Sequence, residues 1–128
     1  MPQPSSSKPA AAQQAAFWEQ AAENGSFVNR GPARIDRVGN RWALSVLCSG
    51  THTTYLDDTT IDLQSYTKGF VRARYRYVER DVPNPRCVQA PCGPITERRI
   101  ALEELTVDPI SAADAEARAK SCRSPESE

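Results

Sequence analysis

The chain has 128 residues and a mass of 14.1 kDa, a length that suits one domain with or without tails and argues against a multidomain enzyme. Its 16 Lys and Arg residues balance 16 Asp and Glu residues, so the overall charge provides no attraction to nucleic acid or to a membrane surface. No apolar run is long enough to span a membrane as a helix.

The amino-terminal part combines a polar tether with a helical pattern. Residues 1–9 are mostly Pro, Ser and Gln, which is typical of a disordered leader, and we expect any secretory signal to have been removed. Residues 10–25 are rich in helix formers and end at Asn24-Gly25, which predicts an amphipathic helix. Phe17 and Trp18 on this helix need an apolar surface, either the β region that follows or a second protein.

The stretch 26–110 holds most of the large apolar side chains, and its alternation predicts an all-β domain. A first hairpin is predicted from residues 33–38 and 41–48, which the turn Gly39-Asn40 joins. A second hairpin is predicted over residues 53–63, around an acidic turn.

The second half of the β region contains the strongest strand pattern, residues 70–78, with Val71, Ala73, Tyr75 and Tyr77 expected to face the core. A Pro-rich loop is predicted over residues 81–94, and a further strand over residues 96–107. Residues 111–128 are expected to form a short helix, with Ser111 as its N-cap, and then a frayed tail.

One segment of the β region resembles a known family. Residues 55–63, followed by Gly69-Phe70-Val71-Arg72-Ala73, are similar to a run in bacterial periplasmic OB-fold proteins, where a hairpin precedes a Gly-x-Val-x-Val strand. The resemblance implies a mainly β fold, a small OB-like antiparallel barrel, here flanked by an N-terminal and a short C-terminal α-helix. It carries over no catalytic residues, and the Cys-containing Pro loop departs from the family pattern.

The cysteines favour two disulfide bonds. An even set of 4 Cys in a small, loop-rich chain with 10 Pro is typical of an oxidising compartment, so we expect a periplasmic or extracellular location. Cys87 and Cys92 share one loop and are the preferred pair, which leaves Cys48 with Cys122. Zinc binding by the four cysteines is the competing interpretation. Structural zinc sites usually contain closely spaced pairs such as Cys-x-x-Cys, whereas Cys48 and Cys122 lie far apart in the sequence. We therefore expect no metal and no cofactor.

An excess of arginine marks the segment between Phe70 and Arg99. Arg72, Arg74 and Arg76 lie on one strand face and, with Tyr66, form a candidate surface for an anionic polymer, either nucleic acid or glycan. The alternation sends Tyr75 and Tyr77 to the opposite face, which favours arginines that pair with acidic residues on neighbouring strands.

The sequence contains no recognisable catalytic constellation. His52 is the single histidine and is expected in a loop, while the adjacent Asp57 and Asp58 suit a turn better than an acid–base pair. The leading hypothesis is therefore a non-enzymatic, exported structural or protein-interaction module of a bacterial envelope or extracellular assembly. The expected contact residues are Phe17, Trp18, Val88, Gln89, Ala90 and Pro91. The alternatives are the polymer-binding OB domain and, more weakly, a protease inhibitor that presents the Cys87–Cys92 loop.

Overall fold

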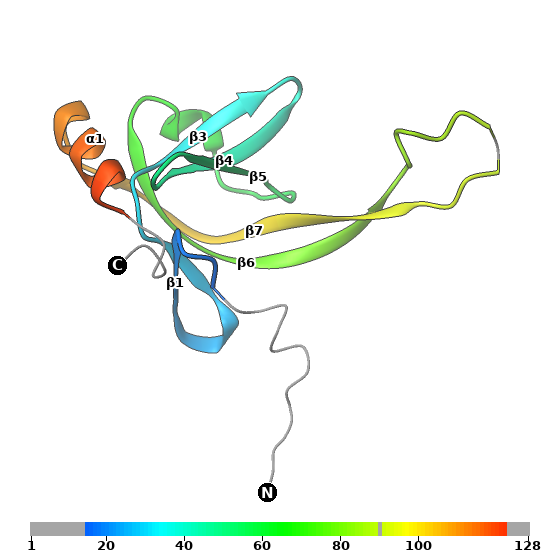
Figure 1. Ribbon diagram of the computed structural model, residues 1–128, viewed down its shortest axis with the longest axis horizontal. Helices are drawn as coiled ribbons and strands as arrows, with labels where there is room; N and C mark the ends of the chain where they lie inside the picture. The colour runs from blue at the N-terminus through cyan, green and yellow to red at the C-terminus, as the bar shows by residue number, and fades with distance from the viewer. Residues whose placement is uncertain (1–14, 90, 123–128) are drawn as a thin grey trace, which may run out of the picture.

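The computed structural model describes residues 15–89 and 91–122, and within these ranges the protein is mainly β (Figure 1). An antiparallel, curled sheet forms a half-barrel with strand order β1-β2-β6-β3-β4-β5, and β7 pairs with β6. The strands are β1 (Glu19–Ala21), β2 (Phe27–Asn29), β3 (Ala33–Val38), β4 (Arg41–Leu47), β5 (Thr51–Tyr55), β6 (Phe70–Val82) and β7 (Ile95–Asp108). The helical elements are the 3-10 turns η2 (Glu23–Gly25) and η3 (Leu63–Tyr66) and the helix α1 (Ala112–Ser121). Across the described ranges, no helix is long and apolar enough to cross a membrane.

The core lies on the inner face of the curled sheet, as the alternation along β6 predicts. Val71, Ala73 and Tyr75 are buried, and Tyr77 packs against the same cluster. Their partners come from neighbouring strands, including Phe27, Ile35, Leu44, Val46, Ile100 and Leu105. The predicted core face of this strand is confirmed, because period-2 alternation on a sheet with one covered side sends every second side chain inward.

The first predicted hairpin is confirmed as β3 and β4. Its register runs from Ala33 opposite Val46 to Val38 opposite Arg41. Gly39 in the turn has a φ of 65°, a left-handed conformation that glycine adopts without a side-chain clash.

The second predicted hairpin, over residues 53–63, is wrong in its returning strand. β5 ends at Tyr55, and residues 57–62 are irregular before η3. Leu56 instead forms a parallel bridge with Ile100, and the Asp57 N–H donates to the Ile100 carbonyl at 2.8 Å. The chain therefore crosses toward β7, because backbone hydrogen bonds to a distant strand replace those of a local return. His52, expected in a loop, lies within β5.

The predicted helix over residues 10–25 is not seen in its described part, and residues 10–14 lie outside the described residues. Glu19–Ala21 instead form β1, which pairs antiparallel with β2. Asn24 and Gly25 have φ values of 62° and 80°, so they turn the chain between the two strands. Strand pairing and the burial of Glu19 outweigh a helix propensity that is worth only tenths of a kcal/mol per residue.

Strands β6 and β7 form the longest hairpin and carry a projecting arm. They pair from Phe70–Asp108 to Val82–Ile95, so both strands extend farther than the predicted ranges. We call residues 79–98 the arm and residues 83–94 at its end the tip loop. Figure 1 shows the arm extending well away from the half-barrel.

Helix α1 and its disulfide confirm the predicted carboxy-terminal element. The Ser111 side chain accepts a hydrogen bond from the Asp114 N–H at 3.0 Å, which caps the first turn. Ala115 is buried, and Cys122 just beyond the helix pairs with Cys48 after β4, with their Cα atoms 4.9 Å apart. The helix is thereby joined covalently to the sheet.

Candidate functional site

The tip loop is a closed ring at the end of the arm. Cys87 and Cys92 form the predicted second disulfide, with their Cα atoms 6.1 Å apart. The Asn84 carbonyl accepts from the Cys87 N–H at 3.1 Å, and the Asn84 side chain accepts from the Arg86 N–H at 2.9 Å. The entry to the ring is therefore a hydrogen-bonded turn rather than an open chain.

The predicted contact residues of this ring point into solvent. Val88 is 97% exposed, and Gln89 and Pro91 are also exposed, while Ala90 lies outside the described residues. An almost fully exposed valine buries nothing within the protein, so its apolar surface is available to another molecule.

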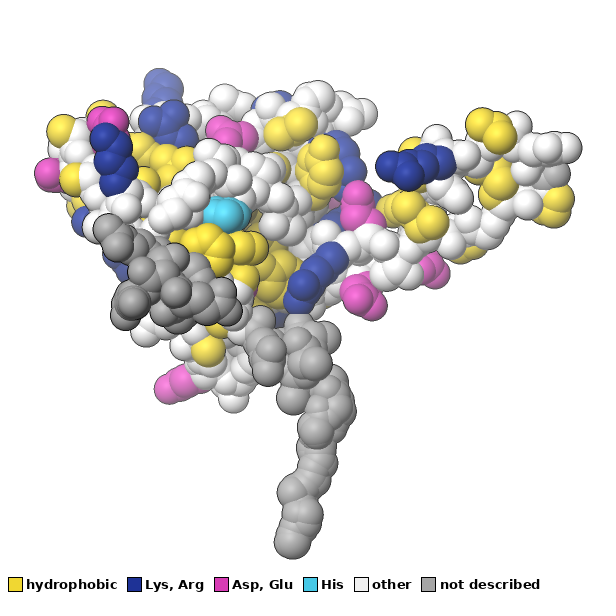
Figure 2. Space-filling view, in the orientation of Figure 1, with side chains coloured by type: hydrophobic (Ala, Val, Ile, Leu, Met, Phe, Trp, Pro, Cys, Tyr) yellow, Lys and Arg dark blue, Asp and Glu magenta, His cyan; other side chains and the backbone are white. Residues whose placement is uncertain are grey.

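Phe17 and Trp18, the other predicted contact residues, pack on the half-barrel. Both are half-buried against the core, and the Trp18 ring stacks on His52 with centroids 4.1 Å apart. The His52 Nε2 atom lies 2.9 Å from the Cys48 carbonyl oxygen. Figure 2 shows the histidine bordering a hydrophobic area of the surface. Of the two apolar surfaces considered for Phe17 and Trp18, the structure shows them packed on the β region of the same chain.

The arginine stripe on β6 is matched by carboxylates on β7. Arg76 lies 2.5 Å from Glu103, Arg74 lies 3.5 Å from Glu103, and Arg72 lies 3.9 Å from Asp108. Tyr66 lies in η3 and packs against the core. The cross-strand pairing favoured from the sequence is present, so much of the positive charge expected for polymer binding is compensated.

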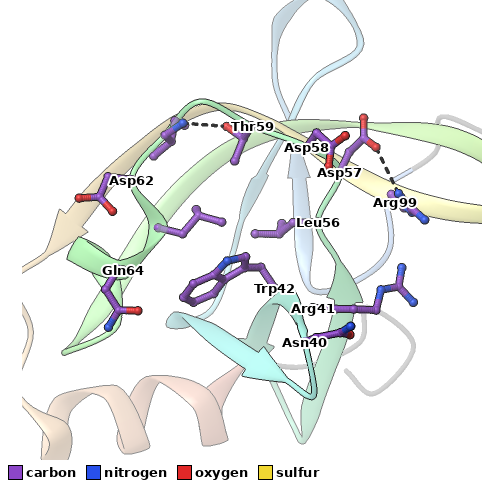
Figure 3. Close-up of a pocket in the computed structure, with 12 residues that line it drawn as sticks. Asn40, Arg41, Trp42, Leu56, Asp57, Asp58, Thr59, Asp62, Gln64 and Arg99 are labelled. Carbon is purple, nitrogen blue, oxygen red and sulfur yellow. Dashed lines mark hydrogen bonds and ion pairs between the residues drawn. The ribbon is translucent and has the colours of Figure 1, made fainter.

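The open end of the half-barrel contains a hollow of about 610 Å³, which we call the mouth (Figure 3). Trp42, Leu56 and Leu63 form its apolar floor, and the latter two are buried. Polar residues from the β3–β4 turn, the start of β4, the irregular segment after β5, η3 and β7 surround this floor. They are Asn40, Arg41, Asp57, Asp58, Thr59, Asp62, Gln64 and Arg99.

A chain of ion pairs beside the mouth joins three strands of the sheet and the irregular segment after β5. Arg41 on β4 lies 2.5 Å from Glu97 on β7, which also contacts Arg99 at 2.8 Å. Asp57 after β5 lies 3.6 Å from Arg99 and 2.7 Å from Arg80 on β6. We call these five residues the ion-pair chain.

These contacts lower the pKa values of the two carboxyl groups in the ion-pair chain, Glu97 and Asp57. Hydrogen bonds from Arg41 and Arg99 lower the pKa of Glu97 to about 2. The hydrogen bond from Arg80 and the attraction of nearby guanidinium groups likewise hold the pKa of Asp57 below its usual value. Both carboxylates therefore stay ionised well into the acid range.

Sequence reasoning missed Glu19, the mouth and the ion-pair chain. Glu19 is only 4% exposed, and its carboxylate accepts hydrogen bonds from the hydroxyls of Tyr75 and Tyr77. Its neighbours Ala, Gln and Trp resemble a helix surface, so nothing local marks it as buried. In the described part of the chain, no group of three or more His, Cys, Asp or Glu side chains is arranged to hold a metal ion.

Comparison with protein-family models, with curated proteins and with solved structures found no match to this chain.

Proposed function

We propose that this protein is a non-enzymatic, exported interaction module that binds a partner protein through the tip loop. The observation that carries the proposal is the 97% exposure of Val88 inside a ring closed by the Cys87–Cys92 disulfide. Surface apolar residues of this kind gain most from burial against a partner.

The construction of the tip loop supports binding to a protein. The disulfide and four prolines, Pro83, Pro85, Pro91 and Pro94, restrict the loop before any contact is made. A restricted loop loses less conformational entropy on binding, so more of its contact energy appears as affinity. Arg86 is the only charged residue of the tip loop, which suits an apolar protein surface better than a charged polymer.

The disulfides and the strand order support the proposed location and the proposed type of barrel. The disulfide pairs indicate a non-reducing environment, which supports a periplasmic or extracellular location. The strand order β6-β3-β4-β5 and the parallel bridge from Leu56 to Ile100 on β7 support the proposal that the half-barrel is an OB-like barrel.

The proposal is tested by photo-crosslinking in cells that make the protein in its native compartment. A photoreactive amino acid replaces Val88 in one variant and Lys120, on the exposed face of α1, in a control variant. We expect one discrete protein adduct from position 88 and none from position 120. Replacing residues 83–94 by Asn-Gly should abolish competition of the purified protein for this adduct. Adducts of equal yield at both positions, or full competition by the loop-replaced protein, would show that the tip loop is not the contact element.

A protease partner would turn the same loop into the inhibitor considered above. The identity of the adduct, followed by an inhibition assay with the isolated partner, separates that case from structural docking. Persistence of full protease activity at saturating protein would remove the inhibitor alternative.

A further inference from the structure

We infer that the mouth is a second binding site, one that accepts a neutral saccharide. It is separate from the tip loop and does not depend on the function proposed for that loop. Its volume of about 610 Å³ lies within the range of about 300–1,000 Å³ that is typical of small-molecule sites. The mouths of β-barrels are a common location for such sites.

The floor of the mouth provides an aromatic and apolar platform. In Figure 3, the Trp42 ring lies across the centre of the hollow, beside Leu56. The guanidinium group of Arg37 lies over the ring at 4.7 Å from its centroid, which fixes the orientation of the indole. A fixed indole suits the C–H face of a sugar ring, because both surfaces are flat and partly apolar.

The rim of the mouth supplies hydrogen-bond donors and acceptors that are not used within the described part of the protein. Among the described residues, the side-chain amides of Asn40 and Gln64 make no hydrogen bond to protein. Each amide offers two donor hydrogens and one acceptor oxygen. The Asp58 carboxylate, also on the rim, adds acceptors and is attracted by Arg80 without a hydrogen bond. The hydroxyl groups of a sugar both donate and accept hydrogen bonds, so they can pair with these amides and with the carboxylate.

The charges around the mouth favour an uncharged ligand. Arg41 and Arg99 are held by Glu97 and Asp57, and further carboxylates from Asp58 and Asp62 lie on the same rim. Because both guanidinium groups are already paired, they attract an anionic ligand little, and the carboxylates of Asp58 and Asp62 repel one. A neutral polar ligand meets no such repulsion and can use the free amides.

The test is an NMR titration of the full, disulfide-bonded chain with glucose, galactose, N-acetylglucosamine and their β-linked disaccharides. We expect saturable shifts of the Trp42 indole N–H and of the Asn40 and Gln64 side-chain amides with at least one of these sugars. The Trp18 indole should not move, and the dissociation constant should change less than twofold between 50 and 300 mM salt, because no ion pair forms.

Variants on the rim separate a site from general surface effects. Gln64→Ala and Asp58→Ala are each expected to weaken the binding at least fivefold, since both side chains are exposed and not part of the core. Gln20→Ala on β1 and Asp81→Ala on the arm are the matched controls and should leave it unchanged. The inference is overturned if none of the sugars shifts these signals at 50 mM, if the rim variants bind as tightly as the controls, or if only a cation such as methylated lysine binds. The crosslink at Val88 reports on the tip loop alone, so the two proposals can fail separately.

Discussion

The buried carboxylate of Glu19 determines how the amino-terminal segment is held. One oxygen accepts from the Tyr75 hydroxyl at 2.7 Å and from the Tyr77 hydroxyl, and the other accepts from the Ala16 N–H at 2.9 Å. Burial and the nearby carboxylate raise the pKa of both tyrosines, so they stay neutral and keep donating. A single side chain on β1 thus satisfies three donors, two of them tyrosine hydroxyls that reach it from β6 across β2.

Glu19→Ala should therefore lower the free energy of unfolding by about 2–4 kcal/mol, because two largely buried hydroxyls lose their acceptor. Urea unfolding followed by tyrosine and tryptophan fluorescence measures this change. Glu23→Ala is the control, since Glu23 is exposed on the same segment and should change stability by less than about 0.5 kcal/mol. Equal effects of the two substitutions would contradict the role given to Glu19.

At the level of elements, two disulfides stabilise two very different structures. The Cys48–Cys122 bond spans 74 positions and joins α1 to the end of β4. The Ser49 N–H also donates to the Ala119 carbonyl at 2.9 Å, so the helix end is held by both covalent and hydrogen bonds. The Cys87–Cys92 bond spans 5 positions and shapes only the tip loop.

Removing one disulfide at a time should show that the Cys48–Cys122 bond stabilises the whole fold and that the Cys87–Cys92 bond affects mainly the tip loop. On the chain-entropy model, Cys48→Ala with Cys122→Ala should cost about 4–5 kcal/mol, and Cys87→Ala with Cys92→Ala about 2 kcal/mol. Chemical denaturation gives both values. Hydrogen exchange should show α1 losing protection in the first variant and keeping it in the second. A larger loss from the tip-loop pair would contradict this assignment.

On the scale of the whole molecule, the ion-pair chain holds the curled sheet together beside the mouth. It connects β4 to β7 through Arg41 and Glu97, and the segment after β5 to β6 through Asp57 and Arg80. The parallel bridge of Leu56 with Ile100 lies in the same region. Closure of this end therefore combines a short backbone contact with several charged side chains.

Stability should consequently fall with acid as these carboxylates are protonated. The pKa of Glu97 is about 2 in the folded protein and about 4.5 in the unfolded chain, so the unfolded state binds more protons in this interval. The stabilisation is complete above about pH 4.5 and is lost as the pH falls to about 2.

Unfolding measured between pH 2 and pH 7 tests this dependence. Glu97→Gln should reduce the slope by up to about 1.4 kcal/mol per pH unit, the value for one proton. Glu116→Gln on the exposed face of α1 is the control and should keep the wild-type profile. An unchanged slope in Glu97→Gln would mean that this carboxylate does not contribute to closure.

Features that depend on neighbouring residues could be predicted from the amino-acid sequence. Alternation along residues 70–78 predicted the buried face of β6, and Gly39 predicted the β3–β4 turn. Ser111 predicted the start of α1, and an even number of cysteines with one close pair predicted both disulfides. Each of these rests on local geometry or on a count, so no knowledge of distant contacts was needed.

Features that depend on partners distant in the chain could not be predicted from the sequence. Residues 19–21 have a helical composition but form β1, because β2 supplies strand pairing and two tyrosines on β6 hold Glu19. The chain after Tyr55 turns to Ile100 instead of forming a hairpin, and this path creates the mouth and the ion-pair chain. Local propensities differ by tenths of a kcal/mol per residue, whereas a buried carboxylate or a lost strand partner is worth several times more, so long-range contacts prevail.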